Sequence, residues 1–117
     1  MNPAAAEQHP RRGEVWWVGF GPSVGGEIQK RRPAIVVSND QANRHLNRLQ
    51  VVPITSNVER LFPSEAYVTV EGEPRKAMAD QLATVSKERL GGRVGRLDAA
   101  DLRGVERAIR VQLGLAS

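Results

Sequence analysis

The sequence predicts an α+β domain, a small twisted β-barrel with one helix packed on it. Several short apolar stretches are separated by glycine- and proline-rich turns, which is typical of strands. Only the last apolar stretch recurs at helical spacing. The 117 residues have room for one domain, and a hydrophobic content of 40% supports a core. That core is thin at this length, so dimerisation is a natural way to bury more surface.

The first strands are predicted on either side of a glycine-rich loop. Residues 14–20 are aromatic and β-branched on both faces, as in a largely covered strand. Residues 21–26 contain three glycines and a proline and predict a loop. Residues 33–38 predict a second strand. Pro33 is tolerated as its first residue, because that position need not donate to the ladder.

A short helix and a third strand follow. Asn39 and Asp40 are good N-caps for a helix over residues 41–47. Residues 49–55 predict the next strand, in which Pro53 indicates an edge or a bulge.

The remaining strands are short. Residues 66–70 alternate weakly and predict a fourth strand, and residues 71–74 have the composition of a turn. Two strand-like pieces surround Asp80-Gln81, and residues 92–97 predict another strand.

The C-terminal segment predicts a helix with defined ends. Asp98 is the expected N-cap, Asp101 places an anion in the first turn, and Gly114 ends the pattern. One stripe consists of Leu102, Val105, Ile109 and Leu113, and a separate face carries Arg103, Arg107 and Arg110.

Composition excludes several classes of site. The absence of cysteine rules out disulfides, thiolate zinc sites and a cysteine nucleophile. His9 and His45 are too few and too far apart to suggest a metal cluster, so we expect no metal and no cofactor. The net charge of +4 suits a polyanionic partner. Residues 1–11 are expected to be a flexible leader before a single domain over residues 12–117, with no signal or membrane-spanning run and a cytoplasmic location.

Polar groups mark the ends of several predicted strands. In chain order these segments are Arg12-Gly13-Glu14-Val15-Trp16, Gly26-Glu27, Arg32-Pro33, Pro53-Ile54-Thr55-Ser56 and Asp80-Gln81. This ordered set resembles the MazF/PemK family from Arg12 through the C-terminal helix. The resemblance implies an SH3-like barrel that forms a homodimer and cleaves single-stranded RNA at short motifs without a metal. It also implies a cognate antitoxin protein whose segment occupies the RNA groove.

The resemblance also implies roles for individual residues. Arg32 and Thr55 match the principal catalytic pair, and Glu27 matches an acidic residue that some members use. The residues expected to contact RNA are Lys30, Arg31, Ser56, Asn57, Asp80 and Gln81. The chain differs from some relatives at Met78, where they place a catalytic arginine.

RNA chemistry supports these roles independently. RNA supplies its own nucleophile, the 2′-OH, so the protein must help remove that proton, neutralise the phosphorane and protonate the leaving 5′-oxygen. Arg32 suits the second task because its guanidinium forks onto two phosphate oxygens. Thr55 can donate a hydrogen bond but is a poor base, whereas Glu27 can act as the base. The general acid stays open. The expected products carry a 2′,3′-cyclic phosphate and a 5′-OH.

Pattern alone permits plainer interpretations. Arg32 lies in a run of three basic residues that can simply flank a strand, and a lone Thr55 more often satisfies its own backbone. Trp16 and Trp17 can stack on bases, although packing is expected for at least one of them. His45 is expected at the surface.

Two other function classes remain open at this stage. A gyrase-poisoning toxin of the same fold binds protein and cuts nothing, but it has no need of the Arg-Pro and Pro-Ile-Thr-Ser segments. A catalytically silent RNA-binding barrel would bind RNA without turnover. Incubation with RNA in a chelator separates both from a nuclease.

Overall fold

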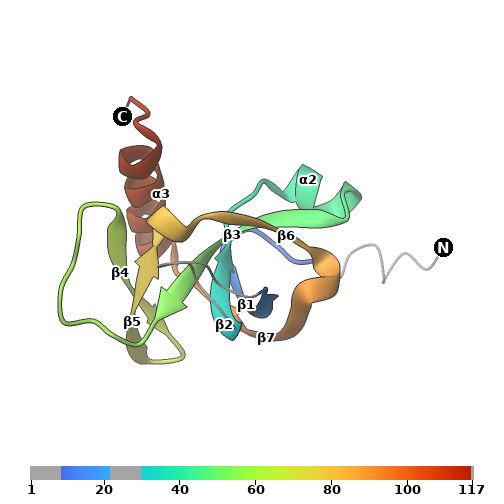
Figure 1. Ribbon diagram of the computed structural model, residues 1–117, viewed down its shortest axis with the longest axis horizontal. Helices are drawn as coiled ribbons and strands as arrows, with labels where there is room; N and C mark the ends of the chain where they lie inside the picture. The colour runs from blue at the N-terminus through green and yellow to red at the C-terminus, as the bar shows by residue number, and fades with distance from the viewer. Residues whose placement is uncertain (1–8, 22–29, 117) are drawn as a thin grey trace.

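The computed structural model describes residues 9–21 and 30–116. In this part of the chain, seven strands form one antiparallel sheet with a long C-terminal helix (Figure 1). The strands are β1 (Glu14–Phe20), β2 (Lys30–Val36), β3 (Arg48–Thr55), β4 (Glu65–Val70), β5 (Glu73–Met78), β6 (Ala83–Ser86) and β7 (Leu90–Arg96). The helices are α2 (Asp40–His45), α3 (Ala99–Leu113) and the single-turn 3-10 helices η1 (Ala79–Gln81) and η2 (Lys87–Arg89).

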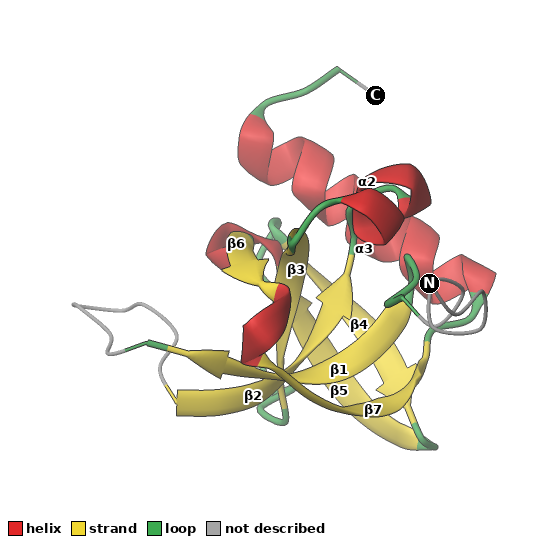
Figure 2. Cartoon of the chain, turned by 90° about the vertical axis from the view of Figure 1, so that its right-hand side faces the viewer, coloured by secondary structure: helices red, strands yellow, loops and turns green. Residues whose placement is uncertain are grey.

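The sheet is twisted into an incomplete barrel. Its strand order is β4-β5-β3-β2-β1-β7, and β6 pairs with β3 beyond the part that pairs with β5. Figures 1 and 2 show the β6–η2–β7 segment curling round the side of β1, β2 and β3. The sheet does not close fully, but the arrangement is the predicted α+β barrel with a terminal helix.

Two apolar clusters lie on opposite faces of β1, β2 and β3. The small cluster is enclosed by the curled strands and consists of Val18, Ala34, Val36, Leu49, Val51 and Val85. The large cluster lies under α3 and the β4–β5 hairpin, and its members include Val15, Ile35, Val52, Ile54, Val68 and Val105. Successive residues of one strand belong to different clusters because their side chains point to opposite faces of the sheet.

The C-terminal helix forms as predicted at both ends. Asp98 caps it by accepting a hydrogen bond of 2.7 Å from the backbone N–H of Asp101, and Gly114 ends it with a φ of 68°. Val105 is fully buried against the large cluster. Leu113, the last residue of the predicted stripe, is 54% exposed where the helix projects beyond the sheet (Figure 1).

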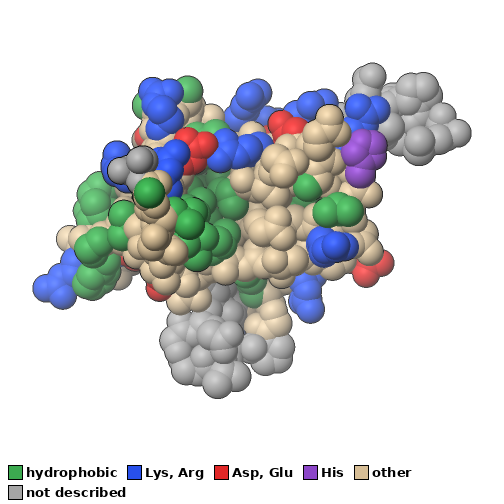
Figure 3. Space-filling model, turned by 90° about the horizontal axis from the view of Figure 1, so that it is seen from above, with side chains coloured by type: hydrophobic (Ala, Val, Ile, Leu, Met, Phe, Trp, Pro, Cys, Tyr) green, Lys and Arg blue, Asp and Glu red, His purple; other side chains and the backbone are tan. Residues whose placement is uncertain are grey.

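Apolar side chains gather around that projecting end, as the view from above shows (Figure 3). Besides Leu113, they include Val111 and Leu115, which are also at least half exposed. The arginines at positions 103, 107 and 110 are exposed, as predicted. Neither α2 nor α3 has the length and apolarity to cross a membrane.

Both strand prolines lie in different surroundings from those predicted. β2 begins at Lys30, so Pro33 is internal; it is tolerated because the recorded pairing with β3 begins only at Ala34. Pro53 is in the central strand β3, not at an edge. It lies where one side of β3 changes partner from β6 to β5, a break that suits a residue without an N–H. The short helix α2 has the predicted N-cap, Asn39, and ends at His45, two residues early.

The start of the domain is held by Arg12. Its guanidinium lies 2.6 Å from the Glu106 carboxylate on α3 and donates a 3.0 Å hydrogen bond to the Val37 carbonyl. Its backbone N–H donates to the Asp40 carboxylate at 2.7 Å. Partial burial on its own would raise the pKa of Asp40. Hydrogen bonds from Arg12 and Asn43, with nearby positive charge, outweigh it and lower that pKa below its ordinary value.

Candidate active site

The position of Arg32 on β2 determines the direction of its side chain. Arg32 pairs with Val18 of β1, and directly paired residues share a face of an antiparallel sheet. Val18 and Ala34 both belong to the small cluster, so the half-buried Arg32 lies on that same face. It is at the end of the barrel where β2 begins.

Thr55 reaches the same place from β3. The register between β2 and β3 pairs Ala34 with Pro53 and Val36 with Val51. The pairs between β2 and β3 end at Ala34 and Pro53, and Arg32 and Thr55 lie two residues beyond these on their strands. Thr55 is also two and four residues from Pro53 and Val51, so the three share a face. The fold therefore brings Arg32 and Thr55 from separate segments to one face at one end of the barrel.

The hydroxyl of Thr55 keeps its proton available. Its oxygen accepts a 3.2 Å hydrogen bond from the backbone N–H of Asn57, and the Asn57 side chain accepts one of 3.2 Å from the N–H of Glu59. Because an accepted hydrogen bond does not use the hydroxyl proton, Thr55 can still donate to a phosphate oxygen. These local bonds also hold the exposed Ser56 and Asn57 beside it.

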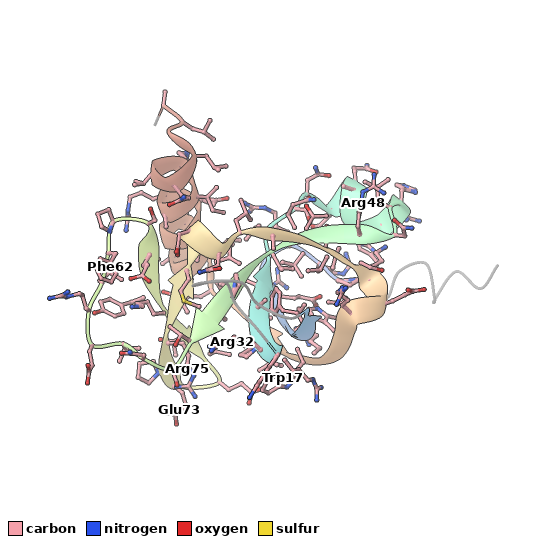
Figure 4. The ribbon with its side chains drawn as sticks, viewed as in Figure 1. Trp17, Arg32, Arg48, Phe62, Glu73 and Arg75 are labelled. Carbon is pink, nitrogen blue, oxygen red and sulfur yellow. The ribbon has the colours of Figure 1, made fainter. Side chains whose placement is uncertain are left out.

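Arg31 lies on the other face of β2. It pairs with Gly19, and its guanidinium stacks over the Trp17 indole, 5.1 Å from the ring centroid. Figure 4 labels Arg32 and Trp17 at the same end of the molecule, with Arg75 and Glu73 nearby. Trp17 is 38% exposed, whereas Trp16 packs against the small cluster, which confirms that at least one of the two packs.

Sequence reasoning missed a buried cation behind Thr55. Lys76 of β5 pairs with Thr55 in the sheet, and its ammonium lies 3.1 Å from the Glu65 carboxylate. The same ammonium donates a 2.6 Å hydrogen bond to the carbonyl of Arg60, in the loop between β3 and β4. This contact ties the loop that follows Thr55 to the sheet. Nothing in the local sequence signals it, because lysine is seldom buried.

Comparison with known proteins assigns the family. The family of PemK-like, MazF-like toxins of type II toxin-antitoxin systems matches residues 11–113. The chain belongs to this PemK/MazF toxin family. It is 38% identical to the endoribonuclease MazF9 of Mycobacterium tuberculosis, across 92% of this chain and 98% of that protein. It is 28% identical to the endoribonuclease EndoA of Bacillus subtilis, across 90% and 95%.

Solved structures of the PemK/MazF type share the fold. An endoribonuclease in complex with its cognate antitoxin, from a mycobacterial species, superposes with a TM-score of 0.78 at 26% identity. MazF from Deinococcus radiodurans superposes with a TM-score of 0.80 at 27% identity. Each match covers 92% of this chain and 98% of the other.

Two other residues expected from the PemK/MazF resemblance, Asp80 and Gln81, lie apart from Arg32. Asp80 and Gln81 belong to η1, which links the β5 and β6 pairings along β3. In Figure 1 this turn lies beside α3, away from the end that carries Arg32 in Figure 4. Lys30 is exposed at the start of β2, and Glu27 lies outside the described residues. His45 is exposed, as expected. Within the described ranges, no three acidic or histidine side chains gather as a metal site requires.

Proposed function

We propose that this toxin is a metal-independent endoribonuclease that cleaves single-stranded RNA, with Arg32 and Thr55 as its catalytic pair. The observation that carries the proposal is the shared face and end of the barrel to which β2 and β3 bring these two residues. Family membership supports the nuclease over a gyrase-poisoning toxin, because the matched relatives are named endoribonucleases.

The cleavage follows from the chemistry of RNA. The 2′-oxygen attacks the adjacent phosphorus, a bond from that oxygen to phosphorus forms, and the bond to the 5′-oxygen breaks. The 2′-OH proton passes to a base and the leaving 5′-oxygen receives one. The products are a 2′,3′-cyclic phosphate and a 5′-OH. Glu27 is the proposed base on the strength of the resemblance.

Arg32 and Thr55 act on the phosphate. The guanidinium of Arg32 stays charged and binds two non-bridging oxygens in a fork, which stabilises the negative charge of the phosphorane. The Thr55 hydroxyl donates to a non-bridging oxygen. No cofactor takes part in this scheme. Six residues are proposed to hold the RNA: Lys30, Arg31, Ser56, Asn57, Asp80 and Gln81.

The proposed partners follow from the family. We infer a homodimer that acts in the cytoplasm and is silenced by a cognate antitoxin whose disordered, partly acidic segment folds into the RNA groove. The apolar surface at the projecting end of α3 supports association, since Val111, Leu113 and Leu115 are exposed in the single chain.

The test is cleavage of a long single-stranded RNA in EDTA, comparing the wild type with Arg32→Ala. Discrete cuts by the wild type that vanish in the variant, with 5′-OH ends, support the proposal. Intact RNA with the wild type on a substrate covering all short motifs, or 5′-phosphate ends, overturns it.

A further inference from the structure

We propose that a cavity beside the catalytic pair binds one nucleobase of the RNA and prefers bases that carry an exocyclic amino group. This inference rests on the proposed function and adds a specificity determinant to it. The cavity has a volume of about 230 Å³. It is lined by Trp17, Pro33, Ile54, Val70, Glu71, Glu73, Arg75 and Val94.

The cavity lining includes the chain neighbours of the catalytic pair. Pro33 directly follows Arg32, and Ile54 directly precedes Thr55. Adjacent strand residues are only about 3.3 Å apart along the chain and point to opposite faces. Since β3 ends at Thr55, we place the phosphate with Arg32 and Thr55 on one face and its base round the end of β3, in the cavity on the other face. Figure 4 shows Trp17, Arg32, Glu73 and Arg75 at this same end.

The cavity offers a flat aromatic surface on which a nucleobase can stack. The Trp17 indole is partly exposed and flat, and the apolar side chains of Pro33 and Ile54 share the lining. Proteins bind unpaired bases by stacking them on such rings, whatever the base. Arg31 stacks on the same indole but is not part of the lining, so it steadies Trp17 and leaves the cavity clear.

The arrangement of Trp17 and Arg31 depends on a glycine of β7. A Cβ on Gly91 would lie 2.6 Å from a terminal nitrogen of Arg31 and 3.1 Å from the Cβ of Trp17. The arginine can move away from such a contact, but the Cβ of Trp17 is fixed by the strand. Gly91 therefore allows the indole and the guanidinium to stack before any ligand arrives.

The polar lining indicates which bases fit. The carboxylates of Glu71 and Glu73 accept hydrogen bonds only, and Arg75 donates only. Adenine, cytosine and guanine each present an amino group to an acceptor. Uracil offers the two carboxylates a single N–H, flanked by carbonyl oxygens that they repel, and of these three charged lining residues Arg75 alone can bind those oxygens. We therefore expect uracil to be disfavoured in this cavity.

The same lining argues against an antitoxin side chain as the occupant. The proposed antitoxin segment is partly acidic, and two carboxylates in the lining repel acidic peptide. A neutral base does not meet this repulsion, and its phosphate lies with Arg32 on the other face of the strand.

The experiment profiles base preference on a random RNA pool. The proteins are the wild type, Trp17→Ala, Trp17→Phe and Glu73→Gln, with the exposed Glu88→Gln of η2 as the matched carboxylate control. Cut sites are mapped by sequencing. Binding is measured in parallel on an oligonucleotide whose cleaved nucleotide is 2′-deoxy, since it lacks the nucleophile.

We expect Trp17→Ala to flatten the preference at one position of the motif and weaken binding by about 5- to 150-fold, the range for loss of one stacked base. Trp17→Phe should retain most of the binding. Glu73→Gln should admit uracil at that position, and Glu88→Gln should match the wild type.

Other outcomes would overturn the inference. They can be distinguished from a failure of the proposed nuclease function. If the wild type cleaves but Trp17→Ala has the same profile and affinity, the base site is wrong and the nuclease stands. If Trp17→Ala binds RNA normally but escapes inhibition by the antitoxin, the cavity binds protein instead. If the wild type neither binds nor cleaves RNA, both proposals fail.

Discussion

The ammonium of Lys76 lies 3.1 Å from the carboxylate of Glu65, and both side chains are more than nine-tenths buried. The pair connects β5 to the start of β4, and each member also holds the loop between β3 and β4. Lys76 donates to the Arg60 carbonyl, and Glu65 accepts a 2.9 Å hydrogen bond from the N–H of Phe62. Since Lys76 is also the sheet partner of Thr55, the loop after a proposed catalytic residue depends on a buried ion pair.

Lys76→Met should destabilise the protein by about 3–5 kcal/mol, because it leaves the Glu65 carboxylate buried without its partner charge. The double variant Lys76→Met/Glu65→Met should cost less than the single change, because no uncompensated charge remains. Urea unfolding measures both, with Lys87→Met of η2 as a lysine control outside this cluster. A double variant less stable than Lys76→Met would contradict this interpretation.

The limits of sequence reasoning are clear at this ion pair. Strand β1 and helix α3 were predicted closely because their signals are local: an apolar run in β1, and Asp98 and Gly114 at the helix ends. Lys76 was missed because its partner Glu65 is on another strand, and only the hairpin brings them together. Pro53 was misplaced because local sequence does not show where a central strand changes partners.

Substitutions at the proposed catalytic pair should separate charge from geometry. Arg32→Lys keeps the charge but loses the fork, and we expect single-turnover cleavage to fall by about 10²-fold or more, as when a transition-state donor is removed. Thr55→Ser should retain more activity than Thr55→Val because only serine keeps the hydroxyl. Arg48→Ala, at the other end of β3 (Figure 4), is the control for loss of an exposed arginine. Full activity of Arg32→Lys would refute the forked contact.

Salt should weaken RNA binding if basic residues hold the phosphates. On a single strand, each removed phosphate contact should reduce the slope of log affinity against log salt by about 0.7. Lys30→Gln and Arg31→Gln are therefore expected to lower that slope as well as the affinity. Titration of a non-cleavable oligonucleotide at several salt concentrations measures this. An affinity of the wild type that does not change with salt would exclude the proposed contacts.

Asp40 should make stability depend on acid pH. Its pKa is lowered in the folded protein, so its contribution is present above the unfolded pKa of about 3.9 and is lost as pH falls through the lower folded value. Asp40→Asn lacks this titration. The wild type should be more stable than the variant at neutral pH, by less than about 1 kcal/mol because solvent screens the exposed carboxylate. Thermal unfolding from pH 7 to pH 3 should show the stability difference between the wild type and Asp40→Asn shrinking. A stability difference that grows in acid would contradict a lowered pKa of Asp40.

The candidate site shows the same division between local and distant signals. Arg32 and Thr55 were identified from the resemblance, and the register of β2 and β3 explains why residues 23 positions apart share one face. The cavity around Trp17 was beyond sequence reasoning, because its lining comes from β1, β2, β3, the β4–β5 hairpin and β7. The pattern did indicate that Trp17 can stack on a base, but not the carboxylates that surround it.

The most direct test replaces one 2′-OH. Once a cleavage site has been mapped, the nucleotide on the 5′ side of the cut is made 2′-deoxy in an otherwise identical RNA, and both RNAs are incubated with the wild type in EDTA. If the RNA supplies the nucleophile, the deoxy site stays intact while other sites in the same molecule are cut to 5′-OH ends. Cleavage at the deoxy site would show that the attacking group comes from elsewhere and would contradict the proposed mechanism.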